Sequence, residues 1–126
     1  MKTTQLSIDE RGTTAIEFAL TAPTFFAILF GVIEFGLIIW TQAGLQHGAE
    51  MAARCASINT ITCGSQSATQ NYAAQEAFGL SLPPSIFTVS TQACGTLVSA
   101  TYSFNTLTHY VGGPTIALNA QSCFPK

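Results

Sequence analysis

Glu17 is an acidic residue near the start of a long apolar segment. No charged residue occurs from Phe18 to Ile33, and apolar residues dominate as far as Trp40. A charged side chain costs roughly 2.5–3.5 kcal/mol at the centre of a membrane-spanning helix and less near its end. An acid at this place therefore needs a partner or a task, and the glycine five residues before it, Gly12, is the first residue to consider.

The apolar segment is long enough to cross a membrane as a helix. Phe18–Trp40 would extend about 34 Å at 1.5 Å per residue. Lys2 and Arg11 precede it, and the next basic residue is Arg54. The excess of basic residues on the N-terminal side predicts a cytoplasmic N-terminus and a C-terminal part outside the cytoplasm.

Residues 1–12 are polar and lack the apolar core of a secretory signal. A secretory signal is cut after its apolar core, whereas here the candidate cleavage site, after Gly12, lies before the apolar segment. We therefore divide the chain into a polar leader at residues 1–12, a long helix at 13–57 that spans the membrane at 18–40, and a small domain at 58–126.

The helical pattern continues beyond Trp40 to about Ser57. Small residues recur there every four positions and form one ridge, with a second ridge at Ala49 and Ala53. Small side chains let another element approach closely. The first ridge either packs against the chain's own domain or contacts another subunit, or does both; it comprises Gly44, Gly48, Ala52 and Ala56.

The sequence of the C-terminal part predicts one short helix and about three antiparallel strands. With the long N-terminal helix, the predicted fold class is α+β. Ser67-Ala68-Thr69-Gln70 has capping-box spacing and predicts a helix that ends near Phe78, before Gly79. Ala74 and Phe78 would face inward. Alternating residues predict the strands: Phe87, Val89, Thr91 and Ala93; Val98, Ala100, Tyr102 and Phe104; and Ile116, Leu118 and Ala120.

A turn at Gly95 and a loop at Asn105–Pro114 would connect the three strands. This loop carries Leu107, His109, Tyr110 and Val111 among polar residues. It is either an apolar tip that contacts partners, or a segment in which Tyr110 and Val111 cover the small core.

The four cysteines indicate a disulfide framework. Intervals of 7, 30 and 28 residues separate them without a CxxC pair, which argues against a zinc or redox site. An even number of cysteines beyond a membrane segment favours an oxidising compartment. Of three possible pairings we expect Cys55–Cys63, a clamp after the long helix, and Cys94–Cys123, a tie from a hairpin to the end of the chain.

The composition excludes several classes of function. Charged residues make up 8% of the chain against about 25% in typical proteins, and the four cations are dispersed, so no nucleic-acid surface is expected. His47 and His109 lack neighbouring ligands, and no catalytic or phosphate-binding motif is present. We predict neither a metal site nor a cofactor nor an enzymatic activity.

Two acidic residues have alternative interpretations. Thr14 and Glu17 also have capping-box spacing, so Glu17 could serve only to satisfy amides at a helix start. Glu34 follows Glu17 by roughly 25 Å along a helix, which places it near the outer interface of the membrane. There it either reaches the lipid headgroups or contacts another subunit.

The segment Arg11-Gly12-Thr13-Thr14-Ala15-Ile16-Glu17-Phe18 resembles a type IV prepilin processing site. With Ala19-Leu20, Pro23, Glu34-Phe35-Gly36 and Ala52-Ala53-Arg54, it more closely resembles the TadE-like pseudopilins of tight-adherence (Tad) pilus systems. The resemblance covers residues 11–57, and the cysteine-bearing part is similar only in general style.

The resemblance implies cleavage by a prepilin peptidase between Gly12 and Thr13. It also implies assembly through the long helix, in which the new Thr13 amine of one copy neutralises Glu17 of a neighbour; Phe18 and Glu34 belong to the same assembly region. The implied partners are other pilin-like subunits, an inner-membrane assembly platform and membrane lipid. The implied location is the bacterial inner membrane with a periplasmic C-terminal domain, which would become extracellular in a pilus.

Two other functions fit the sequence less closely. One is an uncleaved single-pass anchor that displays a periplasmic binding module. The other is a secreted disulfide-rich effector that is cut after the apolar segment.

Overall fold

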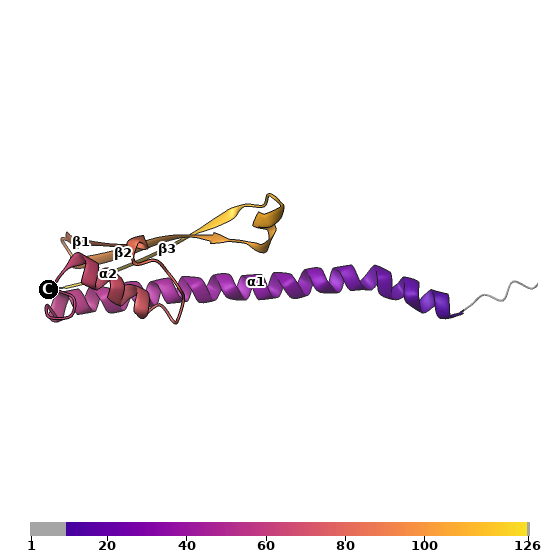
Figure 1. Ribbon diagram of the computed structural model, residues 1–126, viewed down its shortest axis with the longest axis horizontal. Helices are drawn as coiled ribbons and strands as arrows, with labels where there is room; N and C mark the ends of the chain where they lie inside the picture. Colours follow the sequence, from indigo (N-terminus) through magenta and orange to yellow (C-terminus); the bar gives the residue numbers. More distant parts are fainter. Residues whose placement is uncertain (1–9, 126) are drawn as a thin grey trace, which may run out of the picture. The chain divides into compact units, whose positions relative to one another are not determined.

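The computed structural model describes residues 10–125 and has α+β architecture, as the sequence predicts. The chain divides into two compact units, with the boundary between Phe35 and Gly36. The elements are α1 (Glu10–Ile58), α2 (Gln66–Gln75), the 3-10 helix η1 (Pro84–Ile86), β1 (Phe87–Gln92), β2 (Gly95–Asn105), the 3-10 helix η2 (Leu107–Val111) and β3 (Thr115–Phe124) (Figure 1).

Helix α1 begins earlier than the sequence predicts. It covers Glu10–Ile58, so Glu10, the first described residue, is already helical, and Pro23 lies inside it. Because residues 10–13 are already helical, Thr14 is an interior residue of the helix and does not cap it. The interpretation of Thr14 and Glu17 as a capping box is therefore wrong. Residues 1–9 of the predicted leader lie outside the described part of the chain.

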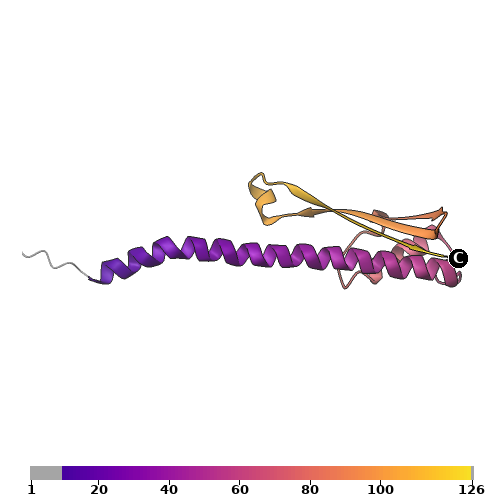
Figure 2. The same cartoon turned by 180° about the vertical axis from the view of Figure 1, so that it is seen from behind.

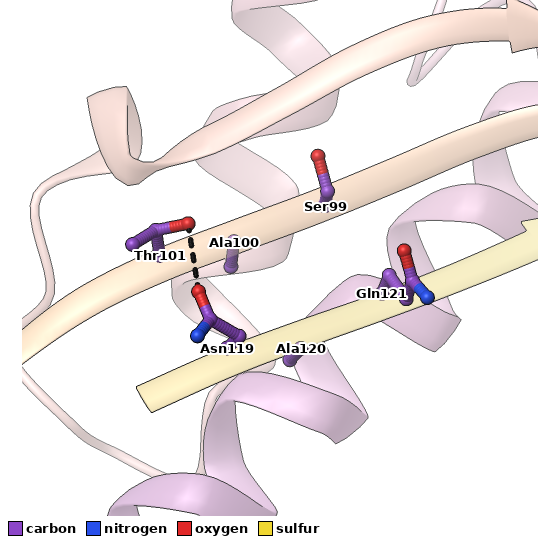
Figure 3. A pocket seen from close by; sticks show the side chains of 6 residues that line it. All are labelled: Ser99, Ala100, Thr101, Asn119, Ala120 and Gln121. Atoms are coloured by element: carbon purple, nitrogen blue, oxygen red, sulfur yellow. Dashed lines mark hydrogen bonds between the residues drawn. The ribbon is translucent and has the colours of Figure 1, made fainter. Parts of the chain in front are cut away.

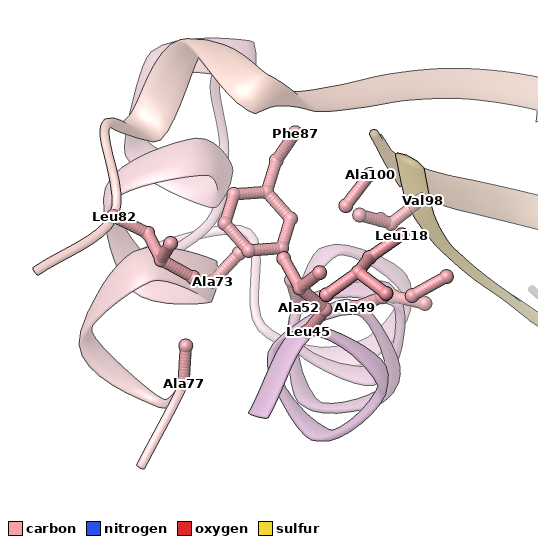
Figure 4. Close-up of a cluster of buried hydrophobic side chains, with 12 residues drawn as sticks. Leu45, Ala49, Ala52, Ala73, Ala77, Leu82, Phe87, Val98, Ala100 and Leu118 are labelled. Carbon is pink, nitrogen blue, oxygen red and sulfur yellow. The ribbon is translucent and has the colours of Figure 1, made fainter. Parts of the chain in front are cut away.

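The core of the C-terminal unit lies between the second half of α1, helix α2 and the sheet. The largest of its fully buried side chains is Phe87 at the start of β1, whose ring lies among residues of all three elements (Figure 4). The other residues of this core are small or aliphatic, and they come from α1 (Leu45, Ala49, Ala52, Ala53), α2 and the turn after it (Ala73, Ala77), and the segment from Leu82 to Ala120.

Two glycines of α1 let this helix approach α2 and the turn that follows α2 closely. A Cβ atom on Gly48 would lie 2.5 Å from the carbonyl oxygen of Ala73, and one on Gly44 would lie 3.0 Å from that of Ala77. Real Cβ atoms do not approach backbone oxygens at 2.5 Å, so a side chain at Gly48 requires the backbone to move. The small ridge predicted from the sequence is thus packed against the chain's own domain along Gly44, Gly48 and Ala52.

The sheet is antiparallel with the order β1-β2-β3. Its inward face carries Val98 and Ala100 from β2 and Leu118 and Ala120 from β3, which are buried as the alternation predicts. The later residues of the edge strand β3 lie beside the C-terminal half of α1, within the same unit (Figure 1, Figure 2). Here Gln42 Nε2 donates to the carbonyl oxygen of Asn119 (2.7 Å), and Gln46 Nε2 donates to that of Gln121 (3.2 Å).

Both predicted disulfides are present. Cys55 at the end of α1 is bonded to Cys63 with their Cα atoms 5.8 Å apart, and Cys94 in the β1–β2 turn is bonded to Cys123 in β3 with their Cα atoms 6.2 Å apart. The first bridge closes the turn between α1 and α2. The second bridge ties the turn between the first two strands to the third.

The prediction for the short helix was wrong at both ends. Ser65, not Ser67, caps α2, because its backbone is extended and its Oγ accepts from the amide of Ala68 (3.2 Å). The helix ends at Gln75, and Phe78 and Gly79 then both have positive φ angles (52° and 73°), which no right-handed helix can contain.

The inward face of this segment is also shifted from the prediction. Ala73 and Ala77 are buried, whereas Ala74 is only half-buried and Phe78 is 49% exposed. The physical reason lies on α1: a face that contacts Gly44 and Gly48 at backbone distance has room for alanine and none for phenylalanine.

The strand boundaries and the loop after β2 differ in detail from the prediction. Strand β1 ends at Gln92, so Ala93 lies in the turn before Gly95. The predicted loop contains the short helix η2. Tyr110 is 86% exposed, which contradicts the interpretation that it covers the core. The side chain of Val111 lies outside the described part of the structure, so its predicted role stays a prediction.

We predict opposite effects for two alanine substitutions in α1. Gly48→Ala should lower the free energy of unfolding by about 1–3 kcal/mol, because the new methyl group meets the Ala73 carbonyl. Gly36→Ala is the matched control: its Cβ meets no atom within 4 Å, so the gain in helix propensity should raise stability by up to about 1 kcal/mol. Urea unfolding in detergent micelles measures both, and equal effects would contradict the close packing.

The two disulfides should differ in their contribution to stability. The chain-entropy model gives about 2.5 kcal/mol for the bridge that links residues 8 apart and about 3.6 kcal/mol for the bridge that links residues 29 apart. Replacing both cysteines of one bridge by serine should therefore be more damaging at Cys94 and Cys123 than at Cys55 and Cys63. Urea unfolding of the two double variants measures this, and the reverse order would contradict the model.

Candidate functional site

The N-terminal part of α1 exposes an almost continuous apolar surface. From Gly12 to Phe35 every residue is exposed except Ala22 and Glu34, which are half-buried. The large apolar side chains on this surface are Ile16, Phe18, Leu20, Phe25, Phe26, Ile28, Leu29, Phe30, Val32, Ile33 and Phe35. Exposure on this scale is unfavourable in water, so this surface requires lipid or another protein against it.

Glu17 lies on this surface between Ile16 and Phe18, both of which are exposed. One turn later, Thr21 Oγ1 donates to the carbonyl oxygens of Glu17 (3.0 Å) and Phe18 (3.3 Å). The threonine hydroxyl is therefore satisfied within the helix and suits an apolar environment. The Glu17 carboxylate is the polar group of this turn that still requires a partner when its surroundings become apolar.

A hollow of about 340 Å³ lies beside Glu17 on the same helix. It is lined mostly by apolar side chains, namely Phe18, Thr21, Ala22, Phe25 and Phe26. The rings of Phe25 and Phe26 meet edge to face at 5.6 Å, and that of Phe26 stacks on Phe30 at 6.3 Å. Phe18 thus forms one wall of a recess that an apolar side chain of another helix could fill.

Gly12 and Thr13 are helical residues close to the first described residue of α1, and both are exposed. No atom lies within 4 Å of a Cβ atom built on Gly12. A larger side chain at this position therefore meets no steric obstacle in the described structure. Glycine also lowers helix stability by roughly 1 kcal/mol relative to alanine, which favours local opening of the chain here.

Glu34 is half-buried and stands between two exposed apolar residues, Ile33 and Phe35. The tripeptide Ile-Glu-Phe occurs at residues 16–18 and again at 33–35. Both acids thus have the same immediate neighbours in the sequence, in the same helix.

The predicted ridge of small residues and the two histidines lie in the C-terminal unit. Gly44, Gly48 and Ala52 are buried, and Ala56 is half-buried. His47 Nδ1 lies 2.8 Å from the carbonyl oxygen of Glu76, and its ring stacks on Phe78 at 4.4 Å. His109 is exposed near Tyr110. Residues 10–125 contain no cluster of three or more potential metal ligands.

Sequence reasoning missed a polar hollow on the outer face of the sheet. It measures about 380 Å³, and its polar side chains come from Ser99 and Thr101 on β2 and from Asn119 and Gln121 on β3 (Figure 3). Thr101 Oγ1 donates to Asn119 Oδ1 across the two strands (3.1 Å). The alternation of polar residues in each strand could be seen in the sequence. The register that places these residues of β2 opposite those of β3 could not.

Among the described residues, one helix is long and apolar enough to cross a membrane. It covers Gly12–Ile58 with a mean hydropathy of 2.1 in its apolar window, none of which is buried inside the protein. This exposure distinguishes it from the core helix of a soluble protein, which is mostly buried.

The same segment matches a known family model. Residues 12–54 match the model described as TadE-like protein. This segment is TadE-like. The match confirms the resemblance predicted from the Arg11–Leu20 motif. No curated protein and no solved structure matches the chain.

The TadE-like match has consequences at a coarse level of function. It relates residues 12–54, the apolar part of α1 and the turns after it, to TadE-like proteins. The apolar helix is consistent with single-pass membrane anchoring.

Proposed function

We propose that the chain is a minor pilin-like subunit of a Tad-type pilus, cut by a prepilin peptidase between Gly12 and Thr13 and assembled through α1. The observation that supports this most directly is the exposed apolar surface of the TadE-like segment with one acid, Glu17, close to its start. This surface suits a lipid bilayer before assembly and a bundle of similar helices after it.

Processing after Gly12 is supported by the local chain. A peptidase must take the backbone of its substrate into a narrow cleft, and glycine offers the least obstruction there. Glycine also weakens a helix locally, which favours the opening of the chain that a peptidase requires. Gly12 combines both properties, and the leader that would be removed is polar.

The role of Glu17 follows from the cost of an unpaired charge in an apolar bundle. Cleavage would create a positive amine at Thr13, four residues before Glu17 in the sequence. When copies lie side by side, the amine of one copy can neutralise the carboxylate of its neighbour. A shift along the helix axis would leave both charges unpaired, so the pair would favour one axial register.

The same proposal places the chain in a bacterial inner membrane before assembly. The N-terminus would be cytoplasmic, since Lys2 and Arg11 precede the apolar segment. The domain with two disulfides would lie in the oxidising periplasm, and outside the cell after pilus assembly. The partners would be the prepilin peptidase, other pilin-like subunits and the inner-membrane assembly platform.

Cleavage can be tested by mass spectrometry and N-terminal sequencing of the membrane-purified protein. The wild-type chain should begin at Thr13, whereas Gly12→Val should keep the leader, because a branched side chain obstructs the peptidase cleft. Gly36→Ala, a change at another exposed glycine of α1, is the control and should be cleaved normally. A wild-type chain that still begins at Met1 would favour the uncleaved anchor with a periplasmic module.

Glu17→Gln should leave cleavage intact but reduce incorporation into the pilus by at least about tenfold, because the Thr13 amine loses its counter-charge. The measurement is the number of copies of the cleaved chain in purified pili. Glu50→Gln, at an exposed acid farther along α1, should have no comparable effect. Normal incorporation of the Glu17 variant would refute the proposed pairing.

A further inference from the structure

The tip of the β2–β3 hairpin is an exposed apolar surface that the proposed function does not use. The hairpin continues beyond β1, because β1 pairs with β2 only as far as Ala100, whereas β2 and β3 pair as far as Asn105 and Thr115. Both views show this projecting part (Figure 1, Figure 2). Between its two strands lies η2, in which Tyr110 is 86% exposed and Leu107 is 60% exposed.

Two hydrogen bonds between α1 and β3 define the direction of the hairpin within the C-terminal unit. Gln42 bonds the carbonyl oxygen of Asn119, and Gln46 bonds that of Gln121. Residue numbers rise in the same order on both elements, so β3 runs in the same direction as α1. Between the two bonds the helix rises by about 6 Å and the strand by about 6.6 Å, so the two elements lie nearly parallel here.

The beginning of β3 extends past the level of Trp40, on its N-terminal side along α1. Trp40 is 56% exposed at the end of the apolar segment, where an interfacial aromatic residue is expected. It precedes Gln42 by two residues, about 3 Å along the helix. Thr115 precedes Asn119 by four residues, about 13 Å along the strand. The start of β3 and the adjoining η2 therefore extend up to about 10 Å beyond Trp40, toward the apolar segment.

Polar groups of the tip are bonded within the loop itself. The amide of His109 donates to the carbonyl oxygen of Thr106 (2.9 Å), and the amide of Gly113 donates to that of Thr108 (2.8 Å). The buried Thr106 Oγ1 donates to the carbonyl oxygen of Pro114 (2.9 Å). The sequence of the whole hairpin carries no lysine, arginine, aspartate or glutamate. Bonded backbone groups and uncharged side chains lower the cost of leaving water, so this tip suits a lipid surface.

We propose that the hairpin tip inserts Tyr110 and Leu107 into the headgroup region of the bilayer that α1 crosses, in the leaflet nearest the domain. The domain would then contact lipid at a second point besides α1. The tyrosine suits this place because its ring is apolar and its hydroxyl can remain among the headgroups. The inference rests on the membrane anchoring in the proposed function, but it requires neither cleavage at Gly12 nor assembly into a pilus.

Fluorescence quenching by brominated lipid tests the insertion in the full-length chain. Trp40 is the single tryptophan, so Trp40→Phe combined with Tyr110→Trp leaves one indole, at the tip. In vesicles of phosphatidylcholine brominated on its upper acyl carbons, the emission should fall about twofold relative to unbrominated vesicles, because an indole at the headgroup boundary lies close to these carbons. The matched control is Trp40→Phe combined with Ile61→Trp. Ile61 is 98% exposed beyond the C-terminal end of α1, and its replacement should be quenched little.

A second measurement needs no substitution at the tip. The isotope-labelled wild-type chain is placed in phosphatidylcholine nanodiscs that hold one chain each, and a lipid with a spin label high on its acyl chain is added. The amide NMR signals of residues 108–110 should broaden, whereas those of Ile61 and Thr62 should stay sharp. Because each disc holds a single chain, broadening at the tip reports lipid and not a second copy.

Quenching of Trp40 in the wild-type chain separates this inference from the proposed function. If Trp40 is quenched but the tip responds to neither lipid probe, the chain is anchored and the inference is wrong. Equal quenching of Tyr110→Trp and of the Ile61→Trp control would also overturn it. Protection of the tip from aqueous iodide only in assembled pili would assign the tip to a neighbouring protein instead. If Trp40 itself is not quenched, the membrane anchoring fails, and the inference fails with it.

Discussion

The packing of the C-terminal unit depends on one contact, in which α1 lies directly against the backbone of α2 and of the turn that follows it. Gly44 and Gly48 have no side chains, so the carbonyl oxygens of Ala77 and Ala73 come close to α1. The Phe87 ring is the one aromatic side chain of the buried core between the two helices and the sheet (Figure 4). The rest of the core is small because the spacing between the elements is small.

One helix therefore meets two opposite demands along its length. Its first part carries large apolar side chains that are exposed and need lipid or protein partners. Its second part presents small residues that are already covered by the chain's own domain. The change from large to small residues falls near Trp40 and Thr41, where the first buried position of α1 occurs. The helix thus presents an exposed apolar surface in one half and a core element in the other.

Much of the fold could be predicted because its signals are local. The apolar segment, the spacing of small residues and the alternation in the strands each occupy a short stretch of sequence, and the four cysteines admit few pairings. The end of the short helix could not be predicted in this way. Ser65 and Ser67 are both good capping residues, and the choice between them depends on how the chain leaves the Cys63 bridge.

Phe78 shows most clearly where local reasoning fails. A large apolar residue at helical spacing predicts burial, but the opposing face of α1 carries glycine, so Ala77 takes the inward position and Phe78 stacks on His47. The candidate site divides similarly. Gly12, Glu17 and Glu34 could be proposed from the sequence alone, because the argument for each comes from its neighbours in the chain. The polar hollow on the sheet was not, since it combines residues from two separate strands.

The glutamines beside the sheet limit how the chain can associate. Gln42 and Gln46 occupy carbonyl oxygens of β3, and Gln70 Nε2 donates to the carbonyl oxygen of Phe87 at the start of β1 (2.6 Å). Both outer strands are thereby partly closed to the addition of a further strand, which is the usual route to amyloid-like aggregates. If copies associate through α1 as proposed above, this closure of the outer strands keeps their sheets from polymerising.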